Sequence, residues 1–129
     1  MAYSEMDYMN IGGGYDNDVI GVEQQIGIIT INGTTYTKYR KIVDFGALPD
    51  TGVKNVAHGI DFTQYKCISL YGAATDNNGT VLPLPNLYYK NSTTQIYNIN
   101  LYLCGGNVRI ETFTDRSTFV GFVVIEYYK

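Results

Sequence analysis

The stretch GIITINGTTYT, residues 27–37, carries the clearest structural signal in this 129-residue chain. Two runs rich in β-branched residues lie on either side of Asn32-Gly33. A two-residue hairpin loop of type I′ needs a positive φ angle at both central residues, and Asn followed by Gly adopts these angles with little strain. The stretch therefore predicts a β-hairpin from which the rest of the chain can be interpreted.

Further runs of strand character follow the hairpin at short intervals, and turn residues such as Asp76-Asn77-Asn78-Gly79 separate them. No segment has a convincing helical period. About eight short strands with so little helix predict an all-β fold, namely an antiparallel β-sandwich or jelly-roll over residues 19–129. The segments that follow the hairpin are 41–45, 53–58, 66–74, 80–84, 95–104, 108–112 and 119–125.

Two of these segments differ in how many faces they bury. Residues 95–104 alternate, with Tyr97, Ile99, Leu101 and Leu103 on one side, which predicts one core face and one solvated face. The final segment, FVGFVVI at 119–125, is apolar on both sides. Such a strand needs cover on its second face, and a neighbouring subunit is the simplest cover. We therefore expect an oligomer interface that includes Phe119, Phe122 and Val124.

Residues 1–18 differ from the rest, because they are acidic, rich in Gly, Tyr and Met, and without a steady period. We expect them to form an extended amino-terminal arm that docks on another protein surface. The residues expected to make that contact are Tyr3, Met6, Tyr8, Met9 and Ile11.

Composition excludes several kinds of partner. Charged residues make up 16% of the chain, below the usual share of about 25%, and the net charge is −3. An electrostatic grip on nucleic acid or on an anionic membrane is therefore not expected. The amino terminus lacks the features of a secretory signal, so we expect synthesis in a cytoplasm. Cys67 and Cys104 can form one disulfide, but that setting favours two buried, reduced thiols.

Few residues are candidates for chemistry, and His58 is the only histidine. Asp61 follows closely, but no nucleophile motif or metal-binding pair accompanies them. His58 is therefore interpreted as a strand-end residue whose imidazole is hydrogen-bonded to a loop beside Gly59, which takes a special backbone angle. No enzymatic activity, cofactor or metal is expected.

Two other sites have a structural and a binding interpretation. Asp115-Arg116-Ser117 can hold a sugar or a carboxylate, but a turn with internal bonds is the simpler interpretation. Tyr88-Tyr89 can stack on a sugar ring, or can pack beneath a loop.

Several segments together resemble a β-rich domain at the carboxyl end of bacteriophage fibre and appendage proteins. The resemblance spans residues 36–129 and includes 39–41, 44–49, 54–60, Pro83-Leu84-Pro85, Asp115-Arg116-Ser117 and the closing residues 125–129. It implies a non-enzymatic virion component, commonly a homotrimer. This chain shows no long shaft before the domain, which favours a short head-fibre, decoration or tail-accessory protein over a long tail fibre.

The resemblance and the residues together predict a virion structural protein whose partners are copies of itself and a capsid, portal or tail protein. The alternative is a carbohydrate- or receptor-binding module that attaches to a host surface, with Tyr88 and Tyr89 at the binding site.

Overall fold

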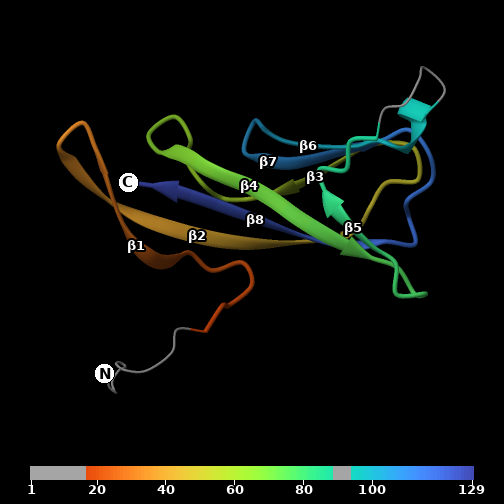
Figure 1. Cartoon of the computed structure of the whole chain (residues 1–129), viewed down its shortest axis with the longest axis horizontal. Helices are drawn as coiled ribbons and strands as arrows, with labels where there is room; N and C mark the ends of the chain where they lie inside the picture. Colours follow the sequence, from red (N-terminus) through yellow and green to blue (C-terminus); the bar gives the residue numbers. More distant parts are fainter. Residues whose placement is uncertain (1–16, 89–93) are drawn as a thin grey trace.

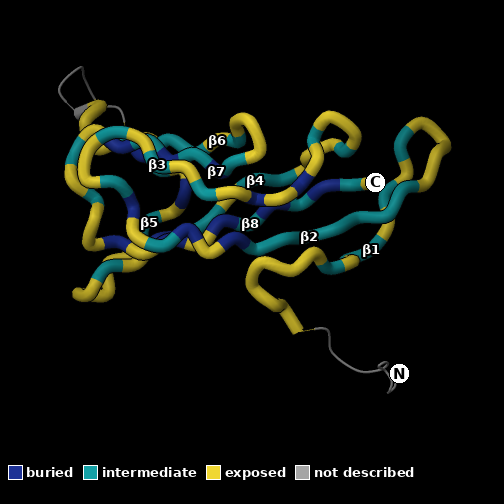
Figure 2. Tube along the Cα trace, turned by 180° about the vertical axis from the view of Figure 1, so that it is seen from behind, coloured by how far each residue is buried: buried dark blue, intermediate teal, exposed yellow. Residues whose placement is uncertain are grey.

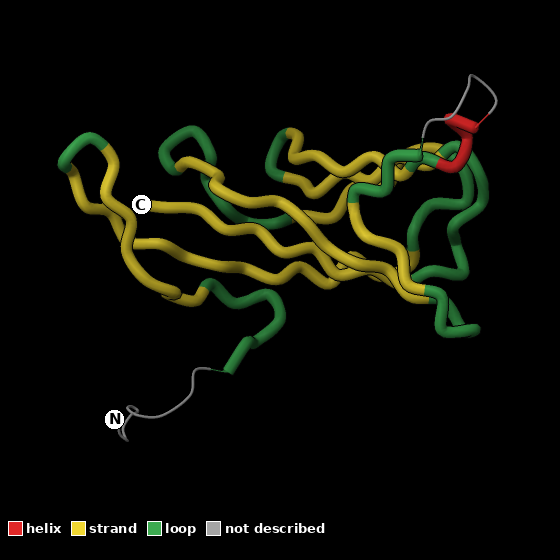
Figure 3. Tube along the Cα trace, viewed as in Figure 1, coloured by secondary structure: helices red, strands yellow, loops and turns green. Residues whose placement is uncertain are grey.

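The computed structural model describes residues 17–88 and 94–129, and it confirms the all-β fold (Figure 1). Eight strands form two antiparallel sheets, and the loops between them gather at the two ends of the molecule (Figure 3). In chain order the strands are β1 (Gln24–Ile31), β2 (Thr34–Ala47), β3 (Gly52–Ala57), β4 (Lys66–Thr75), β5 (Val81–Leu84), β6 (Ile99–Cys104), β7 (Asn107–Thr112) and β8 (Val120–Tyr128).

The five-stranded sheet, here called the large sheet, has the order β1-β2-β8-β4-β5. The three-stranded sheet, here called the small sheet, has the order β3-β7-β6 and covers one face of the large sheet (Figure 1). Strand β8 lies at the centre of the large sheet, where it pairs with β2 on one side and β4 on the other. The last strand in sequence order is therefore the one that joins the two halves of this sheet.

The hairpin predicted from residues 27–37 is present. Asn32 and Gly33 have φ angles of 50° and 81°, the two positive values that a type I′ turn requires. The register follows from this turn, with Ile31 opposite Thr34 and Thr30 opposite Thr35. This end of the large sheet projects beyond the small sheet (Figure 1).

The core fills the space between the two sheets. Every second residue of β8 from Gly121 to Tyr127 is buried, and Figure 2 shows these buried positions along β8. The small sheet contributes Val108 and Ile110, which have no exposed surface. Such alternation is what places one face of each strand in the core. The remaining buried apolar residues are Val43, Phe45, Leu48, Ile60, Ala74, Leu84, Ile99 and Phe119.

Two glycines lie where strands or side chains approach closely. Gly72 of β4 faces β8, and a Cβ atom placed there would overlap the backbone carbonyl of Phe122. Gly121 of β8 faces the core, and a Cβ atom there would lie 2.9 Å from the Leu48 Cδ1 atom. Neighbouring strands therefore depend on Gly72 for their spacing, whereas Gly121 only makes room for a side chain.

Lys54 connects the two sheets at one edge. It lies on β3, the edge strand of the small sheet, opposite the buried Ile110, so its side chain points inward. Its Nζ atom donates to the carbonyl oxygens of Phe45 and Ala47, at 3.0 and 2.6 Å. The same atom lies 4.9 Å from the centre of the Phe45 ring. An inward lysine on an edge strand is a known way of protecting free backbone groups from pairing with another chain.

Hydrogen bonds from β2 and from the end of the chain hold the segment that precedes β1. Gly21 donates its backbone N–H to the Ile42 carbonyl at 2.7 Å. Glu23 accepts hydrogen bonds from the buried Tyr127 hydroxyl and, at 2.9 Å, from Lys129. Burial acts to raise the pKa of Glu23, but these two donors and the nearby positive charges outweigh it and lower that pKa. This segment is thereby fixed to β2 and β8.

One expected strand is shorter than its sequence pattern indicates. Residues Thr94–Tyr97 form a turn of 3-10 helix, and β6 begins only at Ile99. The backbone N–H of Asn98 closes this turn on the Gln95 carbonyl at 3.0 Å. Tyr97 is therefore 47% exposed, so its expected place on the core face was wrong. Within the part of the chain that the structure describes, no helix has the length and hydrophobicity to cross a bilayer.

Candidate functional site

The outer face of the large sheet is the first candidate site. The residues of β8 that alternate with its buried positions point away from the core, and Val120 and Phe122 are 48% and 43% exposed. Apolar cross-strand neighbours extend this surface, with Tyr71 beside Val124 and Ala73 beside Phe122, while Asp44 beside Phe122 and Thr75 beside Val120 are polar. We call this surface the apolar patch, and its members are Ile42, Tyr71, Ala73, Val81, Pro83, Val120, Phe122 and Val124.

The three residues expected at an oligomer interface divide between the two faces. Phe122 and Val124 lie on the apolar patch. Phe119 is only 8% exposed and belongs to the core of the single chain. It precedes β8 in a turn, where its backbone N–H donates to the Arg116 carbonyl at 2.9 Å. Strand β8 therefore begins at Val120, one residue after the start of the apolar run.

Charged residues lie at one end of the apolar patch. Arg40 donates to Glu126 at 3.0 Å and lies 3.6 Å from Asp18. Lys38 and Lys66 are each opposite Tyr128 at the same end of the sheet. The residues expected to dock the arm, Tyr3, Met6, Tyr8, Met9 and Ile11, are outside the described residues.

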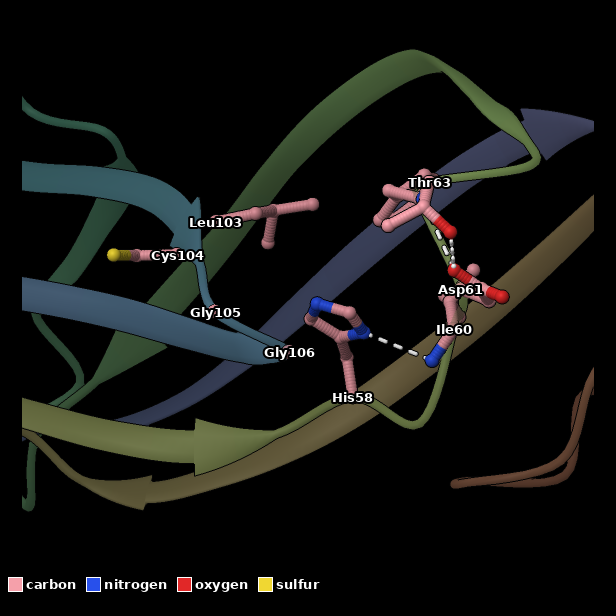
Figure 4. Close-up of a pocket in the computed structure, with 9 residues that line it drawn as sticks. His58, Ile60, Asp61, Thr63, Leu103, Cys104, Gly105 and Gly106 are labelled. Carbon is pink, nitrogen blue, oxygen red and sulfur yellow. Dashed lines mark hydrogen bonds between the residues drawn. The ribbon is translucent and has the colours of Figure 1, made fainter.

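His58 lies in the second candidate site, a hollow of about 410 Å³ between the end of β3 and the β6–β7 turn (Figure 4). The imidazole is 3% exposed, and its Nδ1 atom accepts the Ile60 N–H at 2.9 Å. Gly59 between them has a φ of 70°. The predicted arrangement of a loop-bonded imidazole beside a glycine with a special backbone angle is present.

The groups around His58 are not arranged for nucleophilic catalysis. Asp61 accepts from the Thr63 N–H at 3.0 Å and from Gln64 at 2.8 Å, so its carboxylate caps the turn that follows. Figure 4 shows the Cys104 sulfur pointing away from the imidazole. Because Nδ1 is an acceptor, the neutral ring carries its proton on Nε2. What the His58 imidazole can offer a ligand is thus one hydrogen-bond donor.

His58 gives the protein an expected sensitivity to acid. Burial, and secondarily the charge of Lys41, lower the pKa of His58 below its ordinary value. The unfolded chain therefore binds this proton at a higher pH than the folded chain does, and stability should fall as pH drops below about 6.5. Down to pH about 5.5 we expect a loss of up to about 1 kcal/mol, because the unfolded chain takes up this proton while the folded imidazole stays neutral and keeps accepting the Ile60 N–H.

Urea unfolding between neutral pH and pH about 5.5 measures this loss, because few carboxylates titrate in that window. His58→Asn is the matched variant, since its amide oxygen can accept a hydrogen bond but does not titrate. Its stability should be nearly constant over the same window. Equal pH dependence in the two proteins would contradict the assignment to His58.

The Asp115-Arg116-Ser117 turn is bonded internally. Asp115 accepts from the Ser117 N–H at 2.9 Å and from its hydroxyl at 2.6 Å. Arg116 donates to the Tyr97 carbonyl at 3.1 Å, and among the described residues its Nε atom is the buried side-chain nitrogen without a partner. These bonds match the simpler of the two interpretations made from the sequence.

The expected tyrosine pair is only partly described. Tyr88 is 49% exposed and lies edge-on to Tyr97, with ring centres 6.4 Å apart. Its backbone N–H donates to the Asn98 side chain at 2.5 Å. Tyr89 is outside the described residues. Tyr88 therefore lies beside the 3-10 turn, against an aromatic neighbour that the sequence pattern had placed in the core.

The two cysteines are free, and both residues are exposed, so the expectation that they are buried was wrong. Cys67 is on β4 of the large sheet and Cys104 is on β6 of the small sheet. Partial burial of its thiol raises the pKa of Cys67. Over residues 17–88 and 94–129 no cluster of three or more His, Cys, Asp or Glu side chains could hold a metal.

Comparison with models of known protein families, with curated proteins and with solved structures gives no match to this chain. The resemblance to the bacteriophage fibre domain therefore stays a prediction from the sequence.

Proposed function

We propose that this chain is a non-enzymatic structural protein of a bacteriophage virion, a short head-fibre, decoration or tail-accessory component. It assembles as a homotrimer, and its amino-terminal arm anchors it to a capsid, portal or tail protein. The observation that carries the proposal is the apolar patch on the outer face of the large sheet. Within it Val81, Tyr71 and Phe122 are 60%, 45% and 43% exposed.

The apolar patch favours contact with other copies of the same chain. Soluble monomers rarely leave a contiguous apolar surface larger than a few hundred Å² uncovered. The carboxylate nearest to its centre, Asp44, is opposite Phe122 but accepts the Gly46 N–H at 3.1 Å, which ties it to the backbone. An apolar sheet face packs well against another such face, so copies of the same chain can cover one another's patches. Three copies turned inward around a common axis would bury all three patches.

The arrangement of side chains in the hollow at His58 supports the part of this proposal that assigns the chain no enzymatic role. Two of its polar side chains, His58 and Asp61, are each bonded to a different backbone group, and no hydrogen bond joins them. Assembly also agrees with the low share of charged residues, 16% of the chain, because subunit interfaces are depleted in charge at their centres.

Val120→Lys is expected to dissociate the homotrimer. A charge buried in an apolar interface costs several kcal/mol per copy, and each of the three copies would carry it at the same position. Light scattering over a dilution series should give the unaltered protein a mass three times 14.4 kDa and the variant a mass of 14.4 kDa.

Val53→Lys is the matched control. Val53 is a strand valine with the same exposure as Val120, 48%, but it lies on the outer face of the small sheet. The Val53→Lys substitution should leave the trimer intact. A clean monomer for the unaltered protein, or dissociation by both substitutions alike, would show that the apolar patch is not the assembly surface.

A further inference from the structure

The outer face of the small sheet is largely polar, apart from Val53, where that of the large sheet is largely apolar. The buried Val108 and Ile110 of β7 point to the core, so Arg109 and Glu111 point away from it. Arg109 lies in register between Asn55 of β3 and Tyr102 of β6, and Glu111 lies opposite Asn100. Cross-strand neighbours on one face lie close enough to interact directly.

The side chains on this face hold one another in place. Arg109 donates from Nε to Asn55 at 3.0 Å and from Nη1 to the Tyr102 hydroxyl at 3.4 Å. Its guanidinium also lies 5.7 Å from the centre of the Tyr102 ring. Asn100 donates to Glu111 at 3.3 Å. These contacts order the side chains before any ligand arrives, which lowers the entropic cost of binding.

An exposed aromatic ring and a hollow continue this face toward the end of the sandwich. Phe113, the residue after β7, is 45% exposed and follows the outward alternation of Arg109 and Glu111. It lines a hollow of about 340 Å³ together with Ile96 and the amides of Gln95, Asn98 and Asn100. We call the continuous surface the polar strip, and its members are Asn55, Asn98, Asn100, Tyr102, Arg109, Glu111 and Phe113.

We propose that the polar strip binds a neutral oligosaccharide. A sugar hydroxyl both donates and accepts, and the strip offers donors on Arg109, acceptors on Glu111, and both on its three asparagine amides. The ring of Phe113 supplies the apolar surface on which a sugar ring can stack. From Phe113 to Arg109 the strip runs about 13 Å, at 3.3 Å per residue, which suits a short chain of sugars.

Balanced charge favours a neutral sugar over an acidic ligand. Arg109 and Glu111 are the ionised side chains of the polar strip, and they are two residues apart on the same strand. An anion placed beside Arg109 would also approach Glu111, and the repulsion would offset the attraction. This inference does not depend on the assembly proposal, since the polar strip and the apolar patch are on different sheets.

The test is an NMR titration of the full ¹⁵N-labelled chain with cellohexaose, maltohexaose, laminarihexaose and chitohexaose. At least one of them should shift the backbone signals of residues 98–102 and 109–113, with a dissociation constant in the millimolar range or below. Phe113→Ala removes an exposed ring and should weaken that binding about tenfold. Tyr71→Ala, which removes an equally exposed aromatic ring from the apolar patch, should leave it unchanged.

Three results would overturn the inference. The first is the absence of shifts in residues 98–102 and 109–113 with all four hexasaccharides at millimolar concentration. The second is binding that Phe113→Ala and Tyr71→Ala weaken equally. The third is tighter binding of sialyllactose, a charged sugar, than of any neutral one.

Discussion

Replacing Gly72 with Ala is expected to destabilise the protein by at least about 4 kcal/mol, a large part of the 5–15 kcal/mol typical of a domain. The added Cβ atom would overlap the carbonyl oxygen of Phe122 and lie 3.2 Å from the Val123 Cα atom. Both are backbone atoms of β8, so no rotation of a side chain can relieve the contact. Strands β4 and β8 would have to separate, with loss of hydrogen bonds in the centre of the large sheet.

Gly121→Ala is the matched control for this prediction. It makes the same chemical change on the neighbouring strand, but its Cβ atom would meet the Leu48 and Leu84 side chains, at 2.9 and 3.5 Å. Leucine side chains can shift, so we expect a cost of about 1–2 kcal/mol. Thermal unfolding followed by circular dichroism compares the two variants. Equal losses would mean that β4 and β8 can move apart more easily than their spacing suggests.

Replacing Lys54 with Met is expected to cost about 2–4 kcal/mol. Methionine keeps most of the length and apolar surface of the side chain but cannot donate to the carbonyl oxygens of Phe45 and Ala47. Hydrogen bonds from a charged donor contribute about 1.5–3 kcal/mol each, and partial exposure of Lys54 lowers that figure. The midpoint of urea unfolding measures the loss.

Lys66→Met provides the comparison, because Lys66 is exposed at the start of β4. It should change stability by less than about 0.5 kcal/mol. Lys54→Arg should recover part of the loss, since a guanidinium can also donate to two carbonyls. If Lys54→Met and Lys66→Met were equally mild, the connection between the sheets at this edge would not depend on Lys54.

The sequence predicted correctly those elements whose structure is determined by residues close together in the chain. The Asn32-Gly33 turn follows from two backbone angles, and the alternation in β7 follows from burial of one face. The sequence pattern failed at Thr94–Tyr97, where alternating apolar residues continued an apparent strand into a 3-10 turn. That turn closes through backbone hydrogen bonds, and Tyr97 packs against Tyr88. The apolar alternation here therefore reflects contacts within the turn, and not a strand with one buried face.

The candidate sites were predicted less completely, because they depend on which strands are neighbours. Phe122 was expected at an exposed face, and it lies on one. The polar strip was missed, although residues 107–112 alternate in the sequence, and this alternation identifies the members of the strip that lie on β7. Its other members come from β3 and β6, and only the sheet order brings Asn55, Arg109 and Tyr102 into one row. The inward role of Lys54 was missed for the same reason.

The central place of β8 determines when this sheet can form during synthesis. Strands β2 and β4 are both made early, but each pairs with β8, which is the eighth strand to leave the ribosome. Until residues 120–128 emerge, both strands keep a long edge of unpaired backbone groups next to exposed apolar side chains. Such edges can pair with other chains, so the nascent protein is open to aggregation until β8 has emerged. The large sheet is then expected to form late and slowly, because three of the six strand pairs, β2 with β8, β4 with β8 and β3 with β7, join distant parts of the chain.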